Sequence, residues 1–322
     1  IRNLMTKELY DIIIIGGGPA GLTAGLYAGR AEMNTLLIER YLLGGQILLT
    51  ERVENYPGFP GGITGLELAG RIKEQACKVG LIIKQDSITE IREEKHKDFK
   101  KAFKLITEEG KEYNAVSIIF AAGAAWKRLG SPGVEKFAGK GVSYCAICDG
   151  PMFRNKKVVV VGGGDKAVEE GLYLTKFASE VTLVHRRDRL RAAKILQGAL
   201  EKNNRMKLCL NSVVTSIEGD KAVSGVKVKN AQDGSEKVIP CQGIFIFVGI
   251  KPNSTLIKDK VKTDENGYII TDNDMRTSME GVFACGDVRK KSLQQIVTAT
   301  GEGAQAAVSA QKYVETLKGT AY

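Results

Sequence analysis

The sequence has no uninterrupted apolar run near the roughly 18 residues that a membrane-spanning helix needs, so no spanning segment is expected. Histidine is scarce, with two residues in 322, and the six cysteines include one closely spaced pair. Because a structural zinc site usually needs four cysteine or histidine ligands, no metal site is expected. Hydrophobic residues make up 43% of the chain and charged residues 26%. This composition excludes a disordered chain, a collagen-like chain and a small disulfide scaffold.

The excess of positive charge is spread along the chain. The formal net charge is +10, from 47 basic and 37 acidic residues, without a basic tail or a basic stripe interleaved with aromatics. We therefore expect a solvated lysine surface and no nucleic-acid binding, while attraction to an acidic protein partner stays open. The segment Ile1–Met5 lacks the apolar core of a secretory signal, and translation is expected to start at Met5. These features predict a cytoplasmic location, where a close cysteine pair is catalytic or metal-binding more often than structural.

Glycine is abundant, and its first cluster lies in a recognisable setting. The apolar run 11–15 meets the turn Gly16-Gly17-Gly18-Pro19-Ala20-Gly21, which is followed by a helical stretch, 22–32, and a second apolar run, 36–38, that ends at Glu39. Glycines in such a turn let the backbone approach a pyrophosphate, and the helix N-terminus supplies free N–H groups to it. An acid at the end of the second strand accepts hydrogen bonds from a ribose. The alternative is a glycine-rich structural turn.

The same unit recurs 146 positions later. The run 158–161 leads into Gly162-Gly163-Gly164-Asp165-Lys166-Ala167, then a helical stretch, 168–177, and a strand, 181–184. At about 100–200 residues per domain, 322 residues suggest about two domains, one for each copy. Lys166 lies in the first helical turn, where it either adds charge to a pyrophosphate site or points to water.

The position equivalent to Glu39 in the second copy is occupied by His185, which opens the run His185-Arg186-Arg187-Asp188-Arg189-Leu190-Arg191. An acid at this place accepts a hydrogen bond from a free ribose 2′-hydroxyl and repels a 2′-phosphate. Arginines instead offer forked hydrogen-bond donors to that phosphate. The first unit is therefore predicted to bind a dinucleotide such as FAD or NAD, and the second to bind NADPH. A solvated basic loop is the alternative for Arg186, Arg187 and Arg191.

Each unit carries additional strands. Residues 88–113 and 211–239 alternate like antiparallel meanders, the second with a hairpin signal at Asp233-Gly234, and a late strand ends in Cys285-Gly286-Asp287. We expect an α/β protein with two Rossmann-like, three-layer ββα nucleotide-binding domains, the second inserted in the first. The expected boundaries are 1–124 and 253–322 for the FAD-binding domain and 125–252 for the NADPH-binding domain.

A cysteine pair, Cys145-Ala146-Ile147-Cys148, lies just before the first strand of the second unit and is followed by Asp149. Two intervening residues let the sulfurs form a disulfide that reduces and reoxidises readily. Asp149 either protonates a leaving thiolate or caps a turn. Zinc binding and an inert thiol pair are the alternatives for the two cysteines. Hydride transfer from NADPH to a flavin, followed by transfer of two electrons to this disulfide, accounts for the two predicted dinucleotide sites and for the cysteine pair.

With these motifs together, the chain resembles the low-molecular-weight bacterial and archaeal thioredoxin reductases over about residues 10–313. The resemblance rests on both glycine turns, Gly44-Gly45-Gln46, Glu54–Phe59, Cys145–Gly150, the histidine–arginine run and Gly281–Asp287. It implies a homodimer that reduces thioredoxin or a thioredoxin-like dithiol protein, with Cys148 facing the flavin, Cys145 attacking the partner's disulfide and Asp149 exchanging protons. Relatives rotate one domain against the other, and hinges are expected near 123–125 and 249–253.

The resemblance also implies the cofactor contacts. The residues expected around FAD are Gly16, Gly18, Pro19, Ala20, Gly21, Glu39, Gly45, Gln46, Asn55, Gly123, Gly286, Asp287 at the ribityl chain, Gln295 and Ile296. Those expected around NADPH are Gly162, Gly164, Asp165, Lys166, Ala167, His185, Arg186, Arg187 and Arg191.

Two segments depart from the family pattern. Many relatives have Arg-Gln where this chain has Gln294-Gln295, and often two or three aromatics where it has Pro151-Met152-Phe153. A related flavin disulfide reductase with another electron donor or another protein partner is the enzyme alternative. A flavoprotein that senses nucleotide without turnover is the alternative from a different class.

Overall fold

The computed structural model describes residues 9–50, 52–96, 99 and 101–320, and the chain in it divides into two units. The first comprises the chain up to Ala125 together with Lys251–Tyr322, and the second comprises Trp126–Ile250. One unit is therefore inserted in the other, and both have the predicted α/β architecture. The expected start at Met5 lies outside the described residues.

The first unit contains a seven-stranded sheet made of β1 (Leu9–Ile15), β2 (Thr35–Glu39), β3 (Ile82–Gln85), β4 (Ile88–Glu94), β5 (Ala102–Thr107), β6 (Glu112–Phe120) and β17 (Val282–Ala284). Its order is β3-β2-β1-β6-β5-β4, and β17 also pairs with β6. Strands β3, β2, β1, β6 and β17 are parallel, whereas β4, β5 and β6 form the predicted antiparallel meander.

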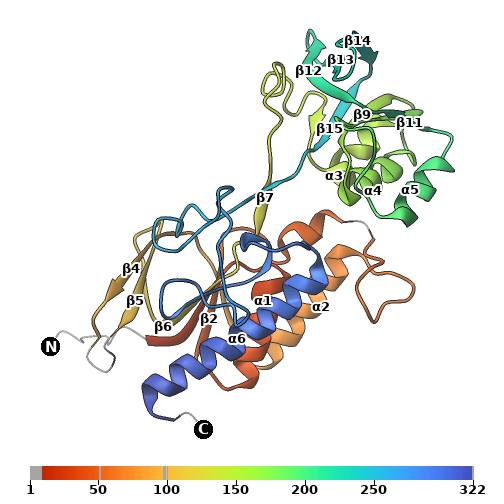
Figure 1. The fold of residues 1–322 in the computed structure, drawn as a ribbon. Helices are drawn as coiled ribbons and strands as arrows, with labels where there is room; N and C mark the ends of the chain where they lie inside the picture. Colours follow the sequence, from red (N-terminus) through yellow and green to blue (C-terminus); the bar gives the residue numbers. More distant parts are fainter. Residues whose placement is uncertain (1–8, 51, 97–98, 100, 321–322) are drawn as a thin grey trace. The chain divides into compact units, whose positions relative to one another are not determined.

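Three helices, α1 (Pro19–Arg30), α2 (Gly65–Lys78) and α6 (Ile296–Lys318), lie together along this sheet (Figure 1). Ile12 and Ile14 of β1 belong to the core that packs under these helices. Ile13 and Ile15 belong to a second core on the opposite face. A central strand buried on both faces is typical of a parallel sheet, which explains the uninterrupted run of isoleucines.

Strand β6 brings the late part of the chain back to the first glycine turn. The first half of β6 pairs with β5, and Ile118–Phe120 pairs with Val282–Ala284 of β17. Because β17 and β1 both run parallel to β6, their carboxyl ends lie at the same edge of the sheet. The residues after β17 therefore lie at the edge that carries the turn after β1.

The second unit has a parallel five-stranded sheet in the order β11-β10-β9-β15-β8 and a separate antiparallel sheet, β12-β13-β14. The strands are β8 (Val142–Ser143), β9 (Lys157–Gly162), β10 (Glu180–Val184), β11 (Met206–Cys209), β12 (Ser212–Gly219), β13 (Val223–Asn230), β14 (Glu236–Pro240) and β15 (Gly243–Phe247). The helices of this unit are α3 (Ala146–Asp149), α4 (Asp165–Leu174) and α5 (Lys194–Glu201).

The two faces of the parallel sheet in this unit have separate cores. Val159 and Val161 pack with residues of the β12–β14 meander, such as Val226. Val158 and Val160 pack with residues of α4. The unit therefore has three layers, meander, sheet and helices, which is the predicted ββα arrangement.

The helix after each glycine turn, α1 or α4, begins three residues earlier than its apolar pattern predicts. The first was expected over 22–32 and spans Pro19–Arg30, because proline is favoured at the first helical position and Glu32, at φ +55°, lies outside the helix. The second was expected over 168–177 and spans Asp165–Leu174. In both turns a glycine serves as the N-cap, at Gly18 and Gly164.

Two short strands, β7 (Ala124–Trp126) and β16 (Ile250–Pro252), pair with each other where the chain passes from one unit to the other. The described part of the chain also contains three 3-10 turns: η1 (Gly45–Leu49), η2 (Gly150–Phe153) and η3 (Gly286–Val288). Among the described residues, no helix combines the length and the apolar character needed to cross a membrane.

Candidate functional site

The turn after β1 can be built only from glycine at its first position. Gly16 has φ +109°, and a Cβ atom there would lie 2.4 Å from the carbonyl oxygen of Ala121. Its N–H donates to the carbonyl of Ile38 at 2.9 Å. The turn is thus pressed between the ends of β2 and β6, which leaves the start of α1 at the edge of the sheet.

The start of α1 is open to an anion. No side chain of the described residues caps the helix at Gly18, and its first turn contains no acidic residue. The first N–H groups of a helix have no partner within the helix and carry partial positive charge. The predicted turn residues Gly18, Pro19, Ala20 and Gly21 therefore form a site suited to a pyrophosphate.

Glu39, the predicted ribose ligand, lies at the end of β2 beside this turn. Its carboxylate accepts hydrogen bonds from the N–H of Gly17 at 2.6 Å and from the N–H of Tyr41 at 2.8 Å. Gly44 donates to the carbonyl of Gly17 at 2.8 Å, which ties the following segment to the same turn. Glu39 therefore fixes the backbone of the turn as well as placing a carboxylate beside it. Its distance in sequence from the glycine turn did not indicate this structural role.

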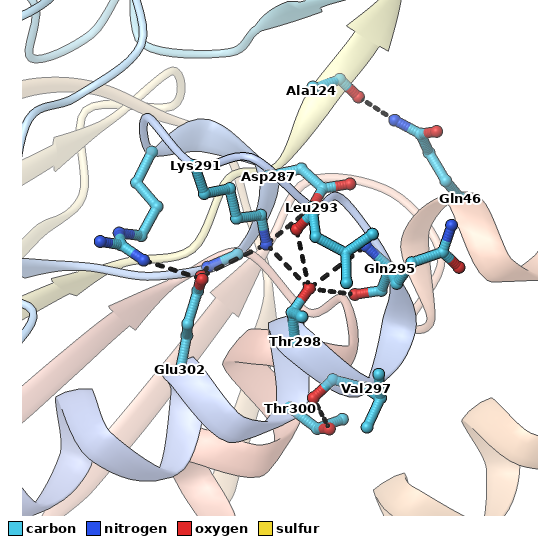
Figure 2. Close-up of polar contacts among 12 residues, drawn as sticks. Gln46, Ala124, Asp287, Lys291, Leu293, Gln295, Val297, Thr298, Thr300 and Glu302 are labelled. Atoms are coloured by element: carbon cyan, nitrogen blue, oxygen red, sulfur yellow. Dashed lines mark hydrogen bonds and ion pairs between the residues drawn. The ribbon is translucent and has the colours of Figure 1, made fainter. Parts of the chain in front are cut away.

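The predicted contacts from three distant segments also gather in the first unit. Gln46 donates from its side-chain amide to the carbonyl of Ala124 (Figure 2). Asn55 donates from Nδ2 to Oε1 of Gln295 at 3.0 Å, across 240 positions. Gln295 is the N-cap of α6, so this helix also begins at the site, with Ile296 as its first residue.

Gly286 lies directly against the first helix, since a Cβ atom there would be 2.9 Å from the Cβ atom of Ala20. This contact places Asp287 beside the start of α1. Oδ1 of Asp287 is buried and makes no hydrogen bond with any described residue, although it forms an ion pair with Lys291 at 3.1 Å. A buried carboxylate oxygen with unused acceptor capacity fits a ligand hydroxyl.

The charged surroundings of Asp287 were missed from the sequence. Lys291 forms ion pairs with Asp287 and Glu302 (Figure 2). Glu302 also forms an ion pair with Arg289. The Asp287–Lys291 spacing of four gave no signal, because η3 ends at Val288 and no helix spans these two residues. The approach of Glu302 depends on how α6 packs against η3, for which the sequence carries no local signal.

The second glycine turn, in the other unit, repeats the first. Gly162 has φ +155°, and a Cβ atom there would lie 2.5 Å from the carbonyl oxygen of Phe247. No side chain of the described residues caps α4 at Gly164. Asp165 accepts from the N–H of Ala193 at 2.7 Å, and Gly163 accepts from the N–H of Arg191 at 2.7 Å. These two bonds hold the arginine-bearing loop against the turn.

His185 lies between this turn and the predicted arginines. Its side chain is buried, and a Cβ atom at Gly163 would lie 2.3 Å from its Nδ1. Burial, and then the positive charges of Arg191, Arg187 and Arg186, lower the pKa of His185 below its usual range. The three arginines are exposed and lie close enough to His185 to repel a proton, so they form one cationic cluster.

Lys166, whose role was open, forms an ion pair with Glu170 one turn further along α4. The Glu170 side chain is almost fully buried. Ala167 is also buried and lies against the turn, since a Cβ atom at Gly162 would be 2.6 Å from its Cβ. Because Lys166 pairs with Glu170 of its own helix, this ion pair gives no direct support to a contact between Lys166 and a pyrophosphate.

The predicted cysteine pair is a disulfide, with the Cα atoms of Cys145 and Cys148 5.4 Å apart. Cys145 is the N-cap of α3, and its sulfur accepts from the N–H of Cys148 at 3.2 Å. The N–H of Cys145 donates to Oγ of Ser143 at 3.0 Å. Cys148 is exposed, whereas Cys145 and Asp149 are partly buried. A peptide N–H directed at sulfur stabilises negative charge on it after reduction.

The other cysteines have no comparable setting. Cys209, Cys241 and Cys285 are buried, and Cys77 is an exposed thiol on α2. Burial raises the pKa of Cys241 to about 12 and that of Cys285 to about 12. Cys241 and Cys285 therefore carry almost no thiolate at neutral pH and are poor nucleophiles.

Each unit by itself thus contains several features that fit the binding of one nucleotide. The first brings the predicted FAD residues to one edge of its sheet, where an uncapped helix start, a glycine turn and a buried carboxylate oxygen fit a dinucleotide. The second holds the glycine turn, the cationic cluster and the disulfide, and the cluster fits a nucleotide with an extra phosphate.

Comparison with known proteins agrees with these features. The pyridine nucleotide-disulphide oxidoreductase family matches residues 10–303. Thioredoxin reductase of Listeria monocytogenes is 49% identical over 313 residues, covering 97% of this chain and 96% of that protein. Thioredoxin reductase of Bacillus subtilis is 48% identical over 315 residues, covering 98% of both. The crystal structure of Lactococcus lactis thioredoxin reductase has a TM-score of 0.91 at 46% identity and covers 95% of this chain and 99% of that one.

These similarities extend over nearly the whole chain, which holds the Cys145–Cys148 disulfide. They identify an oxidoreductase that acts on a disulfide, and the family implies a flavin and a pyridine nucleotide as its cofactors. The chain therefore belongs to the pyridine nucleotide-disulphide oxidoreductase family and, within it, to the low-molecular-weight thioredoxin reductases.

Proposed function

We propose that this protein is an NADPH-dependent, FAD-containing reductase of oxidised thioredoxin. The observation that carries the proposal is the Cys145–Cys148 disulfide, which lies in the unit that also holds a nucleotide turn and a cationic cluster. When bound, FAD and NADPH supply hydride transfer and a pair of electrons for the disulfide. The residues of the chain bind and orient these groups and carry out the exchange with the protein partner.

The first unit is proposed to bind FAD. The start of α1 would hold the pyrophosphate, Glu39 would accept a hydrogen bond from the adenosine ribose, and Asp287 would accept hydrogen bonds from the ribityl chain. Gln46 and Asn55 belong to segments that approach the same edge. Because Glu39 is anionic, this site favours a dinucleotide without a 2′-phosphate.

The second unit is proposed to bind NADPH. The start of α4 would hold the pyrophosphate, while Arg186, Arg187 and Arg191 would bind the 2′-phosphate. Burial is the first cause of the lowered pKa of His185, and the charges of Arg191, Arg187 and Arg186 add to it, at the position where the first unit has an acid. This added effect supports the proposed role of the arginines.

Reduction of the partner follows thiol–disulfide exchange. The thiolate of Cys145, stabilised by the N–H of Cys148, attacks one sulfur of the thioredoxin disulfide and forms a mixed disulfide. The other thioredoxin sulfur leaves as a thiolate and takes a proton from Asp149. The thiolate of Cys148 then attacks Cys145, which releases the second thioredoxin thiolate and re-forms the Cys145–Cys148 disulfide.

The remaining assignments are also proposals. Residues 1–124 and 253–322 would form the FAD-binding domain and residues 125–252 the NADPH-binding domain, in a homodimer. A cytoplasmic location is supported by the free cysteines and by a disulfide of the redox type, both of which suit a reducing compartment. Sedimentation velocity of the FAD-loaded protein tests the dimer directly.

A matrix of donors and acceptors tests the function. NADPH, NADH and reduced ferredoxin are each offered with oxidised bacterial thioredoxin, a glutaredoxin-like protein or a peroxiredoxin, and thiol release is measured. NADPH with thioredoxin is expected to give the highest rate. Cys145→Ser and Cys148→Ser should each abolish thiol release, while the control Cys77→Ser, at a lone exposed thiol, should not change it. Thiol release by either active-site variant would refute the dithiol route, and a preference for ferredoxin would refute NADPH as the donor.

A further inference from the structure

A buried lysine lies beside the proposed ribityl-binding carboxylate. The side chain of Lys291 is 6% exposed, and its ammonium lies 3.1 Å from Oδ1 of Asp287, 3.3 Å from Oε2 of Glu302 and 3.4 Å from Oγ1 of Thr298 (Figure 2). Lysine is almost never this buried unless it is paired. The three oxygen atoms around Nζ provide that pairing and fix the ammonium in one place.

Glu302 links this lysine to the backbone just before Asp287. Its Oε2 accepts from the N–H of Gly286 at 2.8 Å as well as pairing with Lys291. Its Oε1 pairs with Nη1 of Arg289 at 2.8 Å. The side chains of Glu302 and Arg289 are only 13% and 14% exposed, so all these contacts are largely shielded from water.

The cluster is balanced, with two cations and two carboxylates, but burying four charges is costly. Replacing such a group with apolar side chains is often neutral or stabilising, so stability alone is weak grounds for its presence. Its geometry offers a different reason. Glu302 holds the backbone of Gly286, and Lys291 holds the carboxylate of the next residue, so the pair constrains Asp287 at two points.

We propose that Lys291 and Glu302 are positioning residues that hold the Asp287 carboxylate in the orientation that binds the flavin. The inference rests on the proposed function, because it takes FAD as the ligand of Asp287. Neither residue is assigned a contact with the reacting atoms; both act through Asp287. If Lys291 only stabilised the packing of η3 against α6, its effect on FAD binding would not depend on Asp287.

A double-mutant cycle on FAD binding separates these two roles. FAD is removed from the wild type, Lys291→Met, Asp287→Asn and the double variant, and the dissociation constant is measured by quenching of flavin fluorescence on rebinding. Lys291→Met should weaken binding by about tenfold or more, as expected for the loss of a charged partner. In the Asp287→Asn background, the same substitution should have no further effect.

Further variants keep the test decisive if Lys291→Met folds poorly. Lys291→Arg retains the charge and should recover most of the affinity, whereas Glu302→Gln should weaken FAD binding in the wild-type but not in the Asp287→Asn background. The matched control is Lys318→Met on the same helix, since Lys318 pairs with Asp11 at 2.6 Å and is not among the predicted flavin contacts. It should change the affinity by no more than about twofold.

Two results would overturn the inference. One is wild-type affinity in both Lys291→Met and Glu302→Gln, and the other is an equal loss of affinity with and without the Asp287 carboxylate. Failure of the wild-type apoprotein to bind FAD at all would have a different meaning. It would refute the proposed function, and the positioning role with it.

Discussion

Replacing both Arg186 and Arg187 with alanine tests how the second unit recognises its nucleotide. The two guanidinium groups are exposed, and their charges act on the buried ring of His185. A 2′-phosphate bound there would accept charge-assisted hydrogen bonds from both arginines. NADH lacks this phosphate, so its binding should not depend on these arginines.

The expected size of the effect follows from this exposure. A hydrogen bond to a charged group contributes about 1.5–3 kcal/mol, and solvent screening favours the lower end for exposed arginines. Two bonds at about 1.5 kcal/mol each give about 3 kcal/mol, or about a hundredfold loss of preference for NADPH over NADH. The assay compares kcat/KM for the two nucleotides in reduction of the bound flavin.

A second readout is the titration of His185 itself. The chain has only two histidines, His96 and His185, so their imidazole proton resonances can be assigned with a single His185→Asn variant. Removing two of the three nearby positive charges should raise the pKa of His185 toward its ordinary value. The control is Arg189→Ala, in the same exposed loop but not among the predicted phosphate ligands. Equal losses for NADPH and NADH, with an unchanged His185 titration, would refute the proposed cationic site.

Three further predictions concern packing, pH and thiol chemistry. Gly163→Ala should lower the free energy of unfolding by about 1–3 kcal/mol, because its Cβ would meet the His185 ring at 2.3 Å. Gly164→Ala has open space around it, so in denaturant titrations it should cost at most about 1 kcal/mol, for the poorer N-cap that alanine makes. Because the pKa of His185 is lowered in the folded chain, its stabilising contribution is complete above the unfolded pKa of about 6.5 and is lost as the pH falls through the lower folded value. His185→Asn should therefore flatten the fall in Tm on acidification, and an unchanged slope would contradict this cause. Maleimide should label Cys77 in the native oxidised chain, and it should also label the redox dithiol after reduction by NADPH. Cys285 should stay unlabelled in both states, because burial raises its pKa to about 12. If mass spectrometry finds Cys285 labelled, the core around it opens.

The two nucleotide-binding units could be predicted from the sequence because their signals are local. An apolar run, a glycine turn and a helical period lie within about 30 residues of one another, and the turn requires glycine at Gly16 and Gly162 for steric reasons. The apolar pattern predicts both helix starts three residues late because it begins inside each helix, whereas the N-caps are Gly18 and Gly164. The cysteine pair was equally visible, since its spacing alone brings the sulfurs within bonding reach.

The side-chain contacts around Asp287 could not be predicted in the same way. Asn55 and Gln295 meet across 240 positions, and Glu302 reaches Gly286 only because α6 packs beside η3. Such contacts depend on the docking of elements that are distant in the chain, and one sequence carries no record of that docking. The pairing of Lys166 with Glu170 was detectable, since residues four apart on a helix are neighbours.

An anaerobic titration with NADPH tests the electron route most directly. Each FAD-loaded chain should take up about two equivalents of NADPH before the flavin absorbance stops falling, one for the flavin and one for the Cys145–Cys148 disulfide. Cys145→Ser, which has no disulfide to reduce, should take up about one equivalent, and Cys77→Ser should match the wild type. Equal uptake by the wild type and Cys145→Ser would show that the disulfide lies off the route and would contradict the proposed function.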